Sequence, residues 1–469
     1  MLNQTDMAAA DPHTSAFRDE EGALREEFIA RVKQAIEAGD SAALTELVGE
    51  LHQADVGDLL EALDHELRPR LIALMGGDFD FTALTEVDDK VREDILEELP
   101  PRTVAAGVRE MESDDAVYIL EDLPKEEQAD ILEQLPPRER SALERSLYYP
   151  EGSAGRRMQT DFIAVPPFWT VGQTIDYMRE TPELPDRFYE IFVVDPGYRF
   201  QGAVALDRLL RTKRPVPVRE LVDEERIRVL ATEDQENVAR LFEHYNLVAA
   251  PVVDPGNRLV GVLTIDDIVD VIEQAAEEDI KALGGVTHDE ELSDSVWSIA
   301  RGRFNWLLVN LATAFLASSV LGLFEGQLEK MVALAVLAPI VASQGGNAAT
   351  QTMTVAVRAL ATRELGPVNA ARIILRELMV GFVNGLAFAV ITGVAAAAWF
   401  KVPDLGFVIG LAMVCNLVAG ALGGILIPLT IFRLRLDPAV ASGVFVTTVT
   451  DVVGFFSFLG IATLWFGLK

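Results

Sequence analysis

The 469-residue chain has one cysteine, five histidines and few charged residues in its last third. The single cysteine, Cys415, excludes an intrachain disulfide and a cysteine-based metal site. We also find no nucleophile paired with a base, no glycine-rich phosphate loop and no histidine cluster. An enzyme is therefore not expected, and any metal ion should be held by oxygen ligands.

Negative charge is concentrated in the first part of the chain. Residues 301–469 carry eleven Lys and Arg against seven Asp and Glu, so the formal net charge of −33 leaves −37 on residues 1–300. An acid excess of this size repels nucleic acid and attracts cations. A salt-adapted organism, whose soluble surfaces are all acidic, is an alternative cause.

Five long uncharged runs follow the acidic part, and each exceeds the ~18 residues typical of a transmembrane helix. They are Phe304 to Phe324, Met331 to Val357, Leu378 to Phe400, Leu405 to Phe432, and Pro438 to Leu468 with Asp451 as the one interruption. The first thirty residues lack the apolar stretch of a signal peptide. If the acidic part lies inside, eight arginines flank the spans on that side and three lysines on the other. We therefore expect a multi-pass protein of the bacterial inner membrane, with a cytoplasmic N-terminus.

The residues before the spans divide into four segments. We expect a disordered tail at 1–25, an acidic helical domain at 26–157, a duplicated domain at 158–265 and a connecting helix with its linker at 266–300. In the helical domain, leucine-rich units start near Asp55 and Asp115, which we expect to be helix N-caps, and several units end at Leu-Pro. This pattern predicts a small superhelix of stacked helices.

The duplicated domain repeats Val193-Val194-Asp195-Pro196-Gly197 as Val252-Val253-Asp254-Pro255-Gly256. Each copy predicts a strand, a Pro-Gly turn, a second strand and a helix opened by Asp207 or Asp266. This tandem module resembles a pair of cystathionine-β-synthase (CBS) domains, a type that often pairs into a flat disc and can bind adenine nucleotides such as ATP.

The helix opened by Asp266 is predicted to continue to Leu283, where Gly284-Gly285 ends it. Acidic residues follow one another along this helix at three- and four-residue spacing: Asp266, Asp267, Asp270, Glu273, Glu277, Glu278 and Asp279. Like charges at this spacing destabilise a helix by about 0.2–0.5 kcal/mol per pair, and a bound cation would remove that cost. A solvated acidic face is the alternative interpretation.

Asp451 has 13 uncharged residues before it and 17 after it, which places it near the middle of the bilayer. A central Asp costs about 2.5–3.5 kcal/mol on insertion scales, and such residues usually face a water-filled path or pair with another polar group. No Lys or Arg in the spans is deep enough to pair with it. We expect a permeating cation to be its partner, while protonation or a hydrogen bond from Thr447 or Thr448 is the structural alternative.

The second span contains Pro339 and the segment from Gly345 to Gln351. Proline and paired glycines weaken a helix, so carbonyl oxygens can be freed beside a cavity. Asn347 and Gln351 lie one helical turn apart and can face the same pore. Close helix packing through small residues predicts the same glycines. Asn416 is a further polar candidate, for which an interhelical hydrogen bond is the expected role.

The ligand types favour a small hard cation. Mg²⁺ dehydrates reluctantly and is usually held through one or two carboxylates with several waters retained. One carboxylate per subunit with amide and carbonyl oxygens suits hydrated Mg²⁺ better than a Ca²⁺ cage. Mn²⁺ and Co²⁺ would fit similarly.

These features together resemble the MgtE family of magnesium transporters, over almost everything after residue 35. The most specific matches are Met111 to Leu123, Ser153 to Met158, the helix from Asp266 to Leu283, the Gly345 to Gln351 segment, and Asp437-Pro438 with Thr447 to Gly454. The expected fold class is a multidomain membrane protein with an all-α superhelical N domain, an α/β tandem CBS pair, a long connecting helix and an all-α domain of five transmembrane helices at 301–469.

The resemblance implies a homodimeric, Mg²⁺-gated Mg²⁺ channel in which Asp451 holds the hydrated ion and the connecting "plug" helix closes the pore. By position, Asp114, with Asp115 beside it, and Asp267 would share bridging ions. Asp270, Glu278 and Asp279 would face the membrane domain near Asp437. The chain departs from the family pattern at two positions, with Ala349 in place of Gly and Asn246 in place of an acidic residue.

We therefore predict that Mg²⁺ scarcity leaves the acids of the N domain, CBS pair and plug repelling one another, so that the channel conducts, and that abundant Mg²⁺ bridges them and closes it. One alternative is a coupled transporter or exporter of another divalent cation, such as Co²⁺ or Mn²⁺, with Asp451 alternately binding metal and proton. Another is a nucleotide-sensing membrane receptor whose spans serve only as an anchor.

Overall fold

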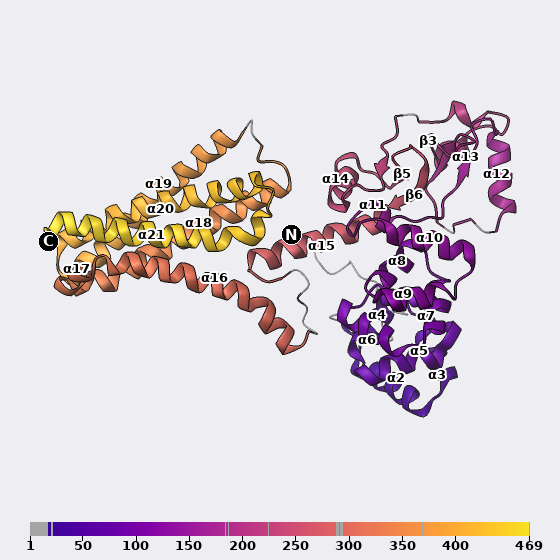
Figure 1. Ribbon diagram of the computed structural model, residues 1–469, viewed down its shortest axis with the longest axis horizontal. Coiled ribbons are helices and arrows are strands. Elements are labelled where there is room, and N and C mark those ends of the chain that lie inside the picture. The colour runs from indigo at the N-terminus through magenta and orange to yellow at the C-terminus, as the bar shows by residue number, and fades with distance from the viewer. Residues whose placement is uncertain are drawn as a thin grey trace, which may run out of the picture. The chain divides into compact units, whose positions relative to one another are not determined.

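The computed structural model describes residues 17–19, 22–182, 184–185, 187–223, 225–287, 290, 294–366 and 369–468. The chain forms two compact units, Met1–Gln274 and Ala275–Lys469, which we describe separately. The first unit contains a helical domain followed by two small sheets, and the second is a bundle of long helices (Figure 1). The multidomain fold class expected from the sequence is confirmed.

The helical domain consists of short helices around a core of Leu, Ile, Val and Phe side chains. Its helices are α2 (Glu26–Ala38), α3 (Ser41–Val48), α4 (Gln53–Ala62), α5 (Arg68–Met75), α6 (Asp89–Glu98), α7 (Pro101–Val108), α8 (Ser113–Glu121), α9 (Lys125–Leu132) and α10 (Pro137–Tyr148). Leu99, Leu123 and Leu135 each follow a helix end and precede a proline, as predicted. The residue before proline is disfavoured in the helical conformation, so these dipeptides separate the helices.

Two helix starts differ from the prediction. The N-cap of α4 is His52, whose ring accepts from the Ala54 amide, and the N-cap of α8 is Glu112. Asp55 and Asp115 lie within the first helical turn instead, so their assignment as N-caps was wrong. A carboxylate in the first turn still interacts favourably with the helix dipole.

The helical domain begins earlier than residue 26. Phe17 is 9% exposed, and its ring centroid lies 5.8 Å from that of Phe28 in α2. The Arg18 Nε donates to the Asp55 Oδ1 at 2.8 Å. Residues 17–19 and 22–25 are therefore part of this domain, while the rest of the expected disordered tail, residues 1–16 and 20–21, lies outside the described residues.

Two three-stranded sheets follow, with strand orders β1-β2-β3 and β4-β5-β6. Their strands are β1 (Ala164–Val165), β2 (Glu190–Val194), β3 (Phe200–Ala205), β4 (Val229–Leu230), β5 (Ala249–Val253) and β6 (Leu259–Thr264), and their helices are α12 (Val171–Glu180), α13 (Leu206–Arg211) and α14 (Gln235–Tyr245). The short helix α11 (Ala154–Arg157) precedes β1.

The two sheets have the same internal register. Glu190 pairs with Ala205 in the first sheet, and Ala249 pairs with Thr264 in the second, so both partners are displaced by the same number of residues. Each antiparallel pair also has a register shift at the same place, between Val193 and Val194 or between Val252 and Val253. The structure therefore confirms the predicted duplication strand by strand.

Asn246, one of the two departures from the family pattern, is the C-cap of α14 with φ 50°. Among non-glycine residues, Asn is one of the few that adopt this left-handed conformation readily. The geometry of the helix end thus gives a structural reason for Asn at this position.

The predicted connecting helix is α15 (Ile265–Leu283). It ends at Gly284-Gly285 as predicted, and Gly285 has φ +73°. A Cβ at Gly285 would lie 2.1 Å from the Trp306 Nε1, so both the backbone angle and the space require glycine here.

Five helices of the described chain are long and apolar enough to cross a membrane, as predicted. These are α16 (Val296–Gly322), α18 (Val332–Ala361), α19 (Ala370–Phe400), α20 (Pro403–Arg433) and α21 (Pro438–Phe466), with the short α17 (Glu325–Lys330) between the first two. Helices α18, α19 and α21 pack against α20, and α16 packs against α21 (Figure 1). The first helix begins before the predicted Phe304, because it includes Arg301 and Arg303.

Candidate functional site

Asp451 and Asn347 lie at the same level of two neighbouring helices. Thr450 of α21 is fully buried, and a Cβ built at Gly346 of α18 would lie 3.8 Å from its Oγ1. The residues that follow these two, Asp451 and Asn347, are therefore close to the same height in the bundle. The structure thus brings together the two segments that the sequence singled out.

The Asp451 side chain is partly exposed on the surface of the single chain. No hydrogen bond or ion pair reaches its carboxylate from any residue that the structure describes. Thr447 donates to the Gly443 carbonyl at 3.0 Å, and Thr448 donates to the Val444 carbonyl at 2.6 Å. Both hydroxyls donate within their own helix, so neither donates to the Asp451 carboxylate, and protonation of Asp451 stays the open structural alternative.

The glycines near this level let helices approach closely. Asn416 of α20 is fully buried, and its Nδ2 donates to the Val341 carbonyl of α18 at 2.8 Å, which confirms the expected interhelical hydrogen bond. A Cβ at Gly345 would lie 2.1 Å from that same nitrogen, and one at Gly424 would lie 2.5 Å from the Ala349 carbonyl. Gly345 is therefore a packing residue, as the small-residue alternative predicted.

Helix α18 is uninterrupted through Pro339 and the Gly345-Gly346 pair. The freeing of several carbonyls is thus not seen, and proline removes only the one bond that its own nitrogen would have donated. Asn347 and Gln351 are both exposed, one turn apart. The described residues contain no group of three or more His, Cys, Asp or Glu that could hold a metal ion. One chain therefore offers one carboxylate and nearby amides at this level.

After Asp451, the next acidic site is formed by Asp279 and Asp437, which we call the second acidic pair. It lies where the end of α15 meets the helical bundle of its own unit. Ala282 and Leu283 pack against the cluster formed by Ala349, Met353, Val357, Ala439 and Val446. Burial raises the pKa of Asp279, and the charges of Asp437 and Glu278 raise it further. The structure therefore places Asp279 near Asp437, which also caps α21 by accepting from the Ala439 amide at 2.8 Å.

A third acidic group, made up of Asp114, Asp115 and Asp267, joins α8 to the start of α15. Asp114 is 7% exposed, and its Oδ1 has no hydrogen-bond partner among the described residues. The Asp267 Oδ2 accepts from the Thr264 hydroxyl at 2.6 Å. The Asp114 carboxyl lies close enough to Asp267 for the two to share a proton. A buried oxygen without a partner is a position that a cation would satisfy.

The carboxyls of this group have raised pKa values because they are buried and lie close to one another. Burial raises the pKa of Asp114 well above its usual range, and the charges of Asp267 and Asp115 add to the rise. Burial and the charges of Asp267 and Glu112 raise the pKa of Asp115 to about 7. Burial raises the pKa of Asp267 to about 6, although hydrogen bonds from Thr264 and Asp114 lower it. A positive charge close to any of these carboxyls would favour its ionised form.

Asp270 has neighbours within the first unit. Burial and the charges of Glu86 and Glu273 raise its pKa, while the Arg157 charge lowers it. Its expected position near Asp437 would be a contact between residues of different units, and it stays a prediction. Glu278 is the sequence neighbour of Asp279 and contributes to the charge at the second acidic pair.

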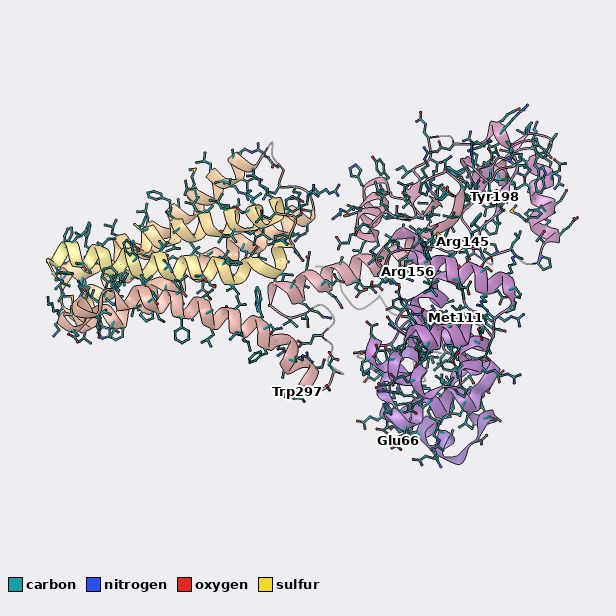
Figure 2. The ribbon with its side chains drawn as sticks, viewed as in Figure 1. Glu66, Met111, Arg145, Arg156, Tyr198 and Trp297 are labelled. Atoms are coloured by element: carbon teal, nitrogen blue, oxygen red, sulfur yellow. The ribbon has the colours of Figure 1, made fainter. Side chains whose placement is uncertain are left out.

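Hydrogen bonds hold α8 to the segment that leads into β1. The Gln159 Nε2 donates to the Glu112 Oε2 at 2.5 Å, and the Thr160 amide donates to the Ser113 Oγ at 2.7 Å. Met111, just before α8, and Arg156, in α11, are labelled in Figure 2, and α11 packs against α8, α14 and β6. The helical domain and the duplicated domain are thus connected at the edge of the third acidic group.

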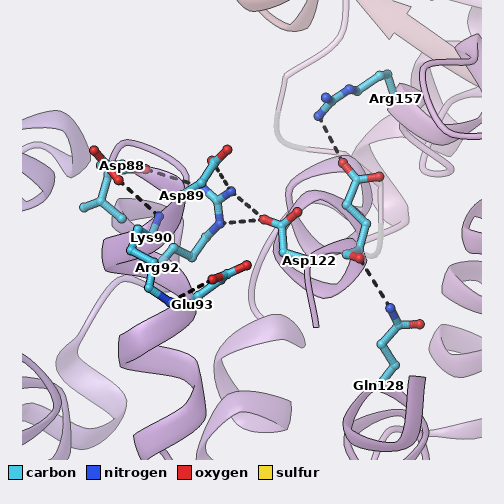
Figure 3. A network of polar contacts seen from close by, with 10 residues as sticks. Asp88, Asp89, Lys90, Arg92, Glu93, Asp122, Gln128 and Arg157 are labelled. Atoms are coloured by element: carbon cyan, nitrogen blue, oxygen red, sulfur yellow. Dashed lines mark hydrogen bonds and ion pairs between the residues drawn. The ribbon is translucent and has the colours of Figure 1, made fainter. Parts of the chain in front are cut away.

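A buried arginine forms a network of ion pairs next to α8 that the sequence did not indicate. Arg92 is 1% exposed and pairs with Asp89 and Asp122 at 2.5 Å each (Figure 3). Its guanidinium lies 4.4 Å from the centroid of the Tyr118 ring. An arginine beside the apolar Val91 gives no sign in the sequence that it is buried, which is why this network was missed.

The cleft between the two CBS copies is narrow. Its lining includes Phe162, Phe188 and Tyr189 from the first copy and Ala249 and Thr264 from the second, and its volume is about 20 Å³. A cavity of this size holds about one water, whereas ligand pockets measure roughly 300–1,000 Å³. A nucleotide at this cleft requires it to widen.

Comparison with known proteins gives three matching family models. They are described as "Divalent cation transporter" over residues 338–461, "MgtE intracellular N domain" over 51–152 and "CBS domain" over 218–274. The first model covers α18 to α21 up to residue 461 and so includes Asn347, Asn416 and Asp451.

Relatives match along nearly the whole chain. The "Magnesium transporter MgtE" of Thermus thermophilus is 32% identical over 450 residues, which cover 94% of this chain and 99% of the relative. The protein of the same name from Bacillus subtilis is 27% identical over 438 residues, 93% of this chain and 97% of the relative. A solved structure, "Crystal structure of the cytosolic domain of the Mg2+ channel MgtE in complex with ATP", is 30% identical and covers 52% of this chain and 99% of its own, with a TM-score of 0.48.

Proposed function

The chain belongs to the MgtE family of magnesium transporters, and from this premise we propose that it transports Mg²⁺ across a membrane through the helices from α16 to α21. Asp451 is the observation that carries the proposal. It is a carboxylate in the middle of a transmembrane helix, and no described residue neutralises or hydrogen-bonds it.

A permeating cation accounts for an ionised group at this depth. A charged side chain in the bilayer usually faces a water-filled path, and Asp451 lies at the level of the exposed Asn347 amide. Hydrated Mg²⁺ needs few direct ligands, so one carboxylate with nearby amides is a suitable set. We propose that a homodimer places two such ligand sets around one axis. A single chain supplies only one of the two sets.

We propose that cytosolic Mg²⁺ closes the transporter by bridging acids at both ends of α15. At one end, Asp114, with Asp115 beside it, and Asp267 share a cation, and at the other end Asp279, with Glu278 beside it, and Asp437 share another. Asp270 contributes to the charge of α15 between them. The packing of Ala282 and Leu283 against α18 and α21 supports the idea that the end of α15 acts as a plug. An ion that binds the closed state more tightly shifts the population toward it.

Location and nucleotide control complete the proposal. The excess of arginine on one side of the spans supports an N-terminus in the cytoplasm and insertion in the bacterial inner membrane. ATP at the CBS pair is the expected second ligand, and its binding would require the cleft at Phe162 and Tyr189 to open.

Flux into liposomes from the purified full-length protein tests the transport proposal. We expect Asp451→Asn to reduce Mg²⁺ flux by at least about tenfold, equivalent to about 1.4 kcal/mol in the barrier. Asp404→Asn, which removes an exposed carboxylate from the first turn of α20, is the matched control and should retain flux. Undiminished flux through Asp451→Asn would overturn the proposal.

The same assay separates the alternatives. Flux that follows an imposed pH gradient would favour a coupled transporter, and a preference for Mn²⁺ or Co²⁺ would change the substrate. Absence of any ion flux from the wild-type protein would favour a receptor that only anchors in the membrane.

A further inference from the structure

Arg157 connects three elements at the junction between the helical domain and the CBS pair. It is the last residue of α11, and its Nη1 lies 3.6 Å from the Oε1 of Glu121 on α8 (Figure 3). Its Nε donates to the Oε1 of Gln235 on α14 at 3.2 Å. One guanidinium therefore contacts a helix of the N domain and a helix of the second CBS copy.

The guanidinium is also held in place by an aromatic ring. Its central carbon lies 4.8 Å from the centroid of the Tyr118 ring, and that of Arg92 lies 4.4 Å from the same centroid. The Arg157 side chain is 20% exposed, so the cation is partly shielded from solvent and salt. A planar guanidinium suits simultaneous contact with a carboxylate and a ring, which an ammonium group does not reproduce.

The surroundings of Arg157 are acidic. Its charge lowers the pKa of Glu121 and that of Asp270 on α15, against the effect of burial in both cases. Asp270 in turn acts on Asp115, a member of the third acidic group. Arg157 is thus a fixed positive charge near Asp270, the α15 carboxylate that acts on the third acidic group.

We propose that Arg157 is a built-in counter-ion that holds the helical domain against the CBS pair when divalent cation is absent, and so limits how strongly Mg²⁺ tightens this junction. The inference rests on the gating part of the proposed function. The contacts with Glu121 and Gln235 stabilise the closed junction without metal. The same charge opposes the arrival of Mg²⁺ nearby, so the additional stabilisation that Mg²⁺ provides is smaller than it would be beside an uncompensated acidic surface.

Hydrogen exchange of the full-length protein in nanodiscs tests this role, with protection of the α8 amides measured without and with saturating Mg²⁺. We expect Arg157→Met to reduce protection about tenfold without Mg²⁺, as the loss of a partly buried ion pair and its cation–π contact implies. The ratio of protection with Mg²⁺ to protection without it should become larger than in the wild type. Arg157→Lys, which keeps the charge, should return that ratio toward the wild-type value.

The outcomes distinguish the inference from a packing role and from the proposed function. A side chain that only fills space would lower protection by the same factor with and without Mg²⁺, and this result, or an unchanged ratio in Arg157→Met, would overturn the inference. Arg208→Met, which removes an exposed arginine of α13, is the matched control and should change neither value. If the wild-type protein itself shows no Mg²⁺-dependent protection, the gating proposal fails instead.

Discussion

Asp114→Asn should strengthen the junction between α8 and α15 in the absence of Mg²⁺ and weaken its response to Mg²⁺. The substitution keeps the size of the side chain and removes a carboxyl that is 7% exposed. It removes the repulsion between the charges of Asp114 and Asp267, which is one of the causes of the raised pKa of Asp114. It also removes one of the two carboxylates that we propose to share an ion.

The size of the effect follows from the shifted pKa values. Burial and the charges of Asp267 and Asp115 raise the pKa of Asp114 well above its usual range, so ionising this carboxyl in the closed junction has a cost that an Asn side chain does not have. The pKa of Asp267 itself is not expected to fall in the variant, because burial is the largest cause of its rise and the hydrogen bond from Asp114 lowers it. We expect the free energy of local opening to rise by about 1–2 kcal/mol without Mg²⁺, or about five- to thirtyfold in protection of the α8 amides.

The pH dependence gives a second check on the same variant. Because the carboxyls have raised pKa values in the closed junction, the closed state binds protons that the open state has released, and its stability falls as pH rises through about 6 to 7. Protection without Mg²⁺, corrected for intrinsic exchange, should therefore be higher near about pH 6 than near about pH 8. The groups that face one another here are Asp114, Asp115, Asp267, Glu112, Asp266 and Asp270. Millimolar Mg²⁺ should reduce the difference, because it stabilises the ionised forms.

Hydrogen exchange of the full-length protein measures all three effects. Asp130→Asn is the matched control, because Asp130 is an exposed carboxylate of the neighbouring α9. If Asp114→Asn left both the Mg²⁺-free protection and the Mg²⁺ response of α8 unchanged, Asp114 would be neither a source of repulsion nor a ligand, and the reasoning would be refuted.

Two further predictions concern packing. Gly345→Ala should destabilise the membrane domain by about 1–3 kcal/mol, because the new Cβ would lie 2.1 Å from the Asn416 Nδ2; thermal unfolding in detergent measures this, and Gly443→Ala, which meets nothing within 4 Å, should be neutral. Arg92→Met should destabilise the helical domain by about 3–5 kcal/mol, because it leaves Asp122 without its buried partner. Denaturant unfolding checks this against Arg140→Met, whose exposed ion pair within α10 should contribute little.

Long-range patterns in the sequence predicted most of the architecture. Uncharged runs of more than twenty residues admit few structures other than membrane spans, and the repeat beginning at Val193 and Val252 specified two equal sheets before any contact was known. Asp451 was identifiable because a lone charge in an apolar run is rare and costly. Those signals depend on composition and spacing, which the sequence states directly.

Local side-chain environments were not predictable in the same way. Asp115 resembles a helix cap in sequence, yet α8 starts at Ser113. The two carboxylates of its first turn, Asp114 and Asp115, belong to the third acidic group instead. Arg92 and Arg157 contact one tyrosine ring from separate segments, and no periodicity announces such a meeting. Buried ion pairs depend on three-dimensional contacts between distant segments, which the pattern of a single sequence does not reveal.

The position of the acids along α15 bears on how a divalent cation could act over a distance. Asp267 and Asp279 both belong to α15. Each has an acidic partner outside the helix, Asp114 for the first and Asp437 for the second. Under the proposed gating, an ion bound at either end would reduce the net negative charge of this helix. Under the proposed gating, two weak sites linked in this way respond to Mg²⁺ more steeply than either site alone.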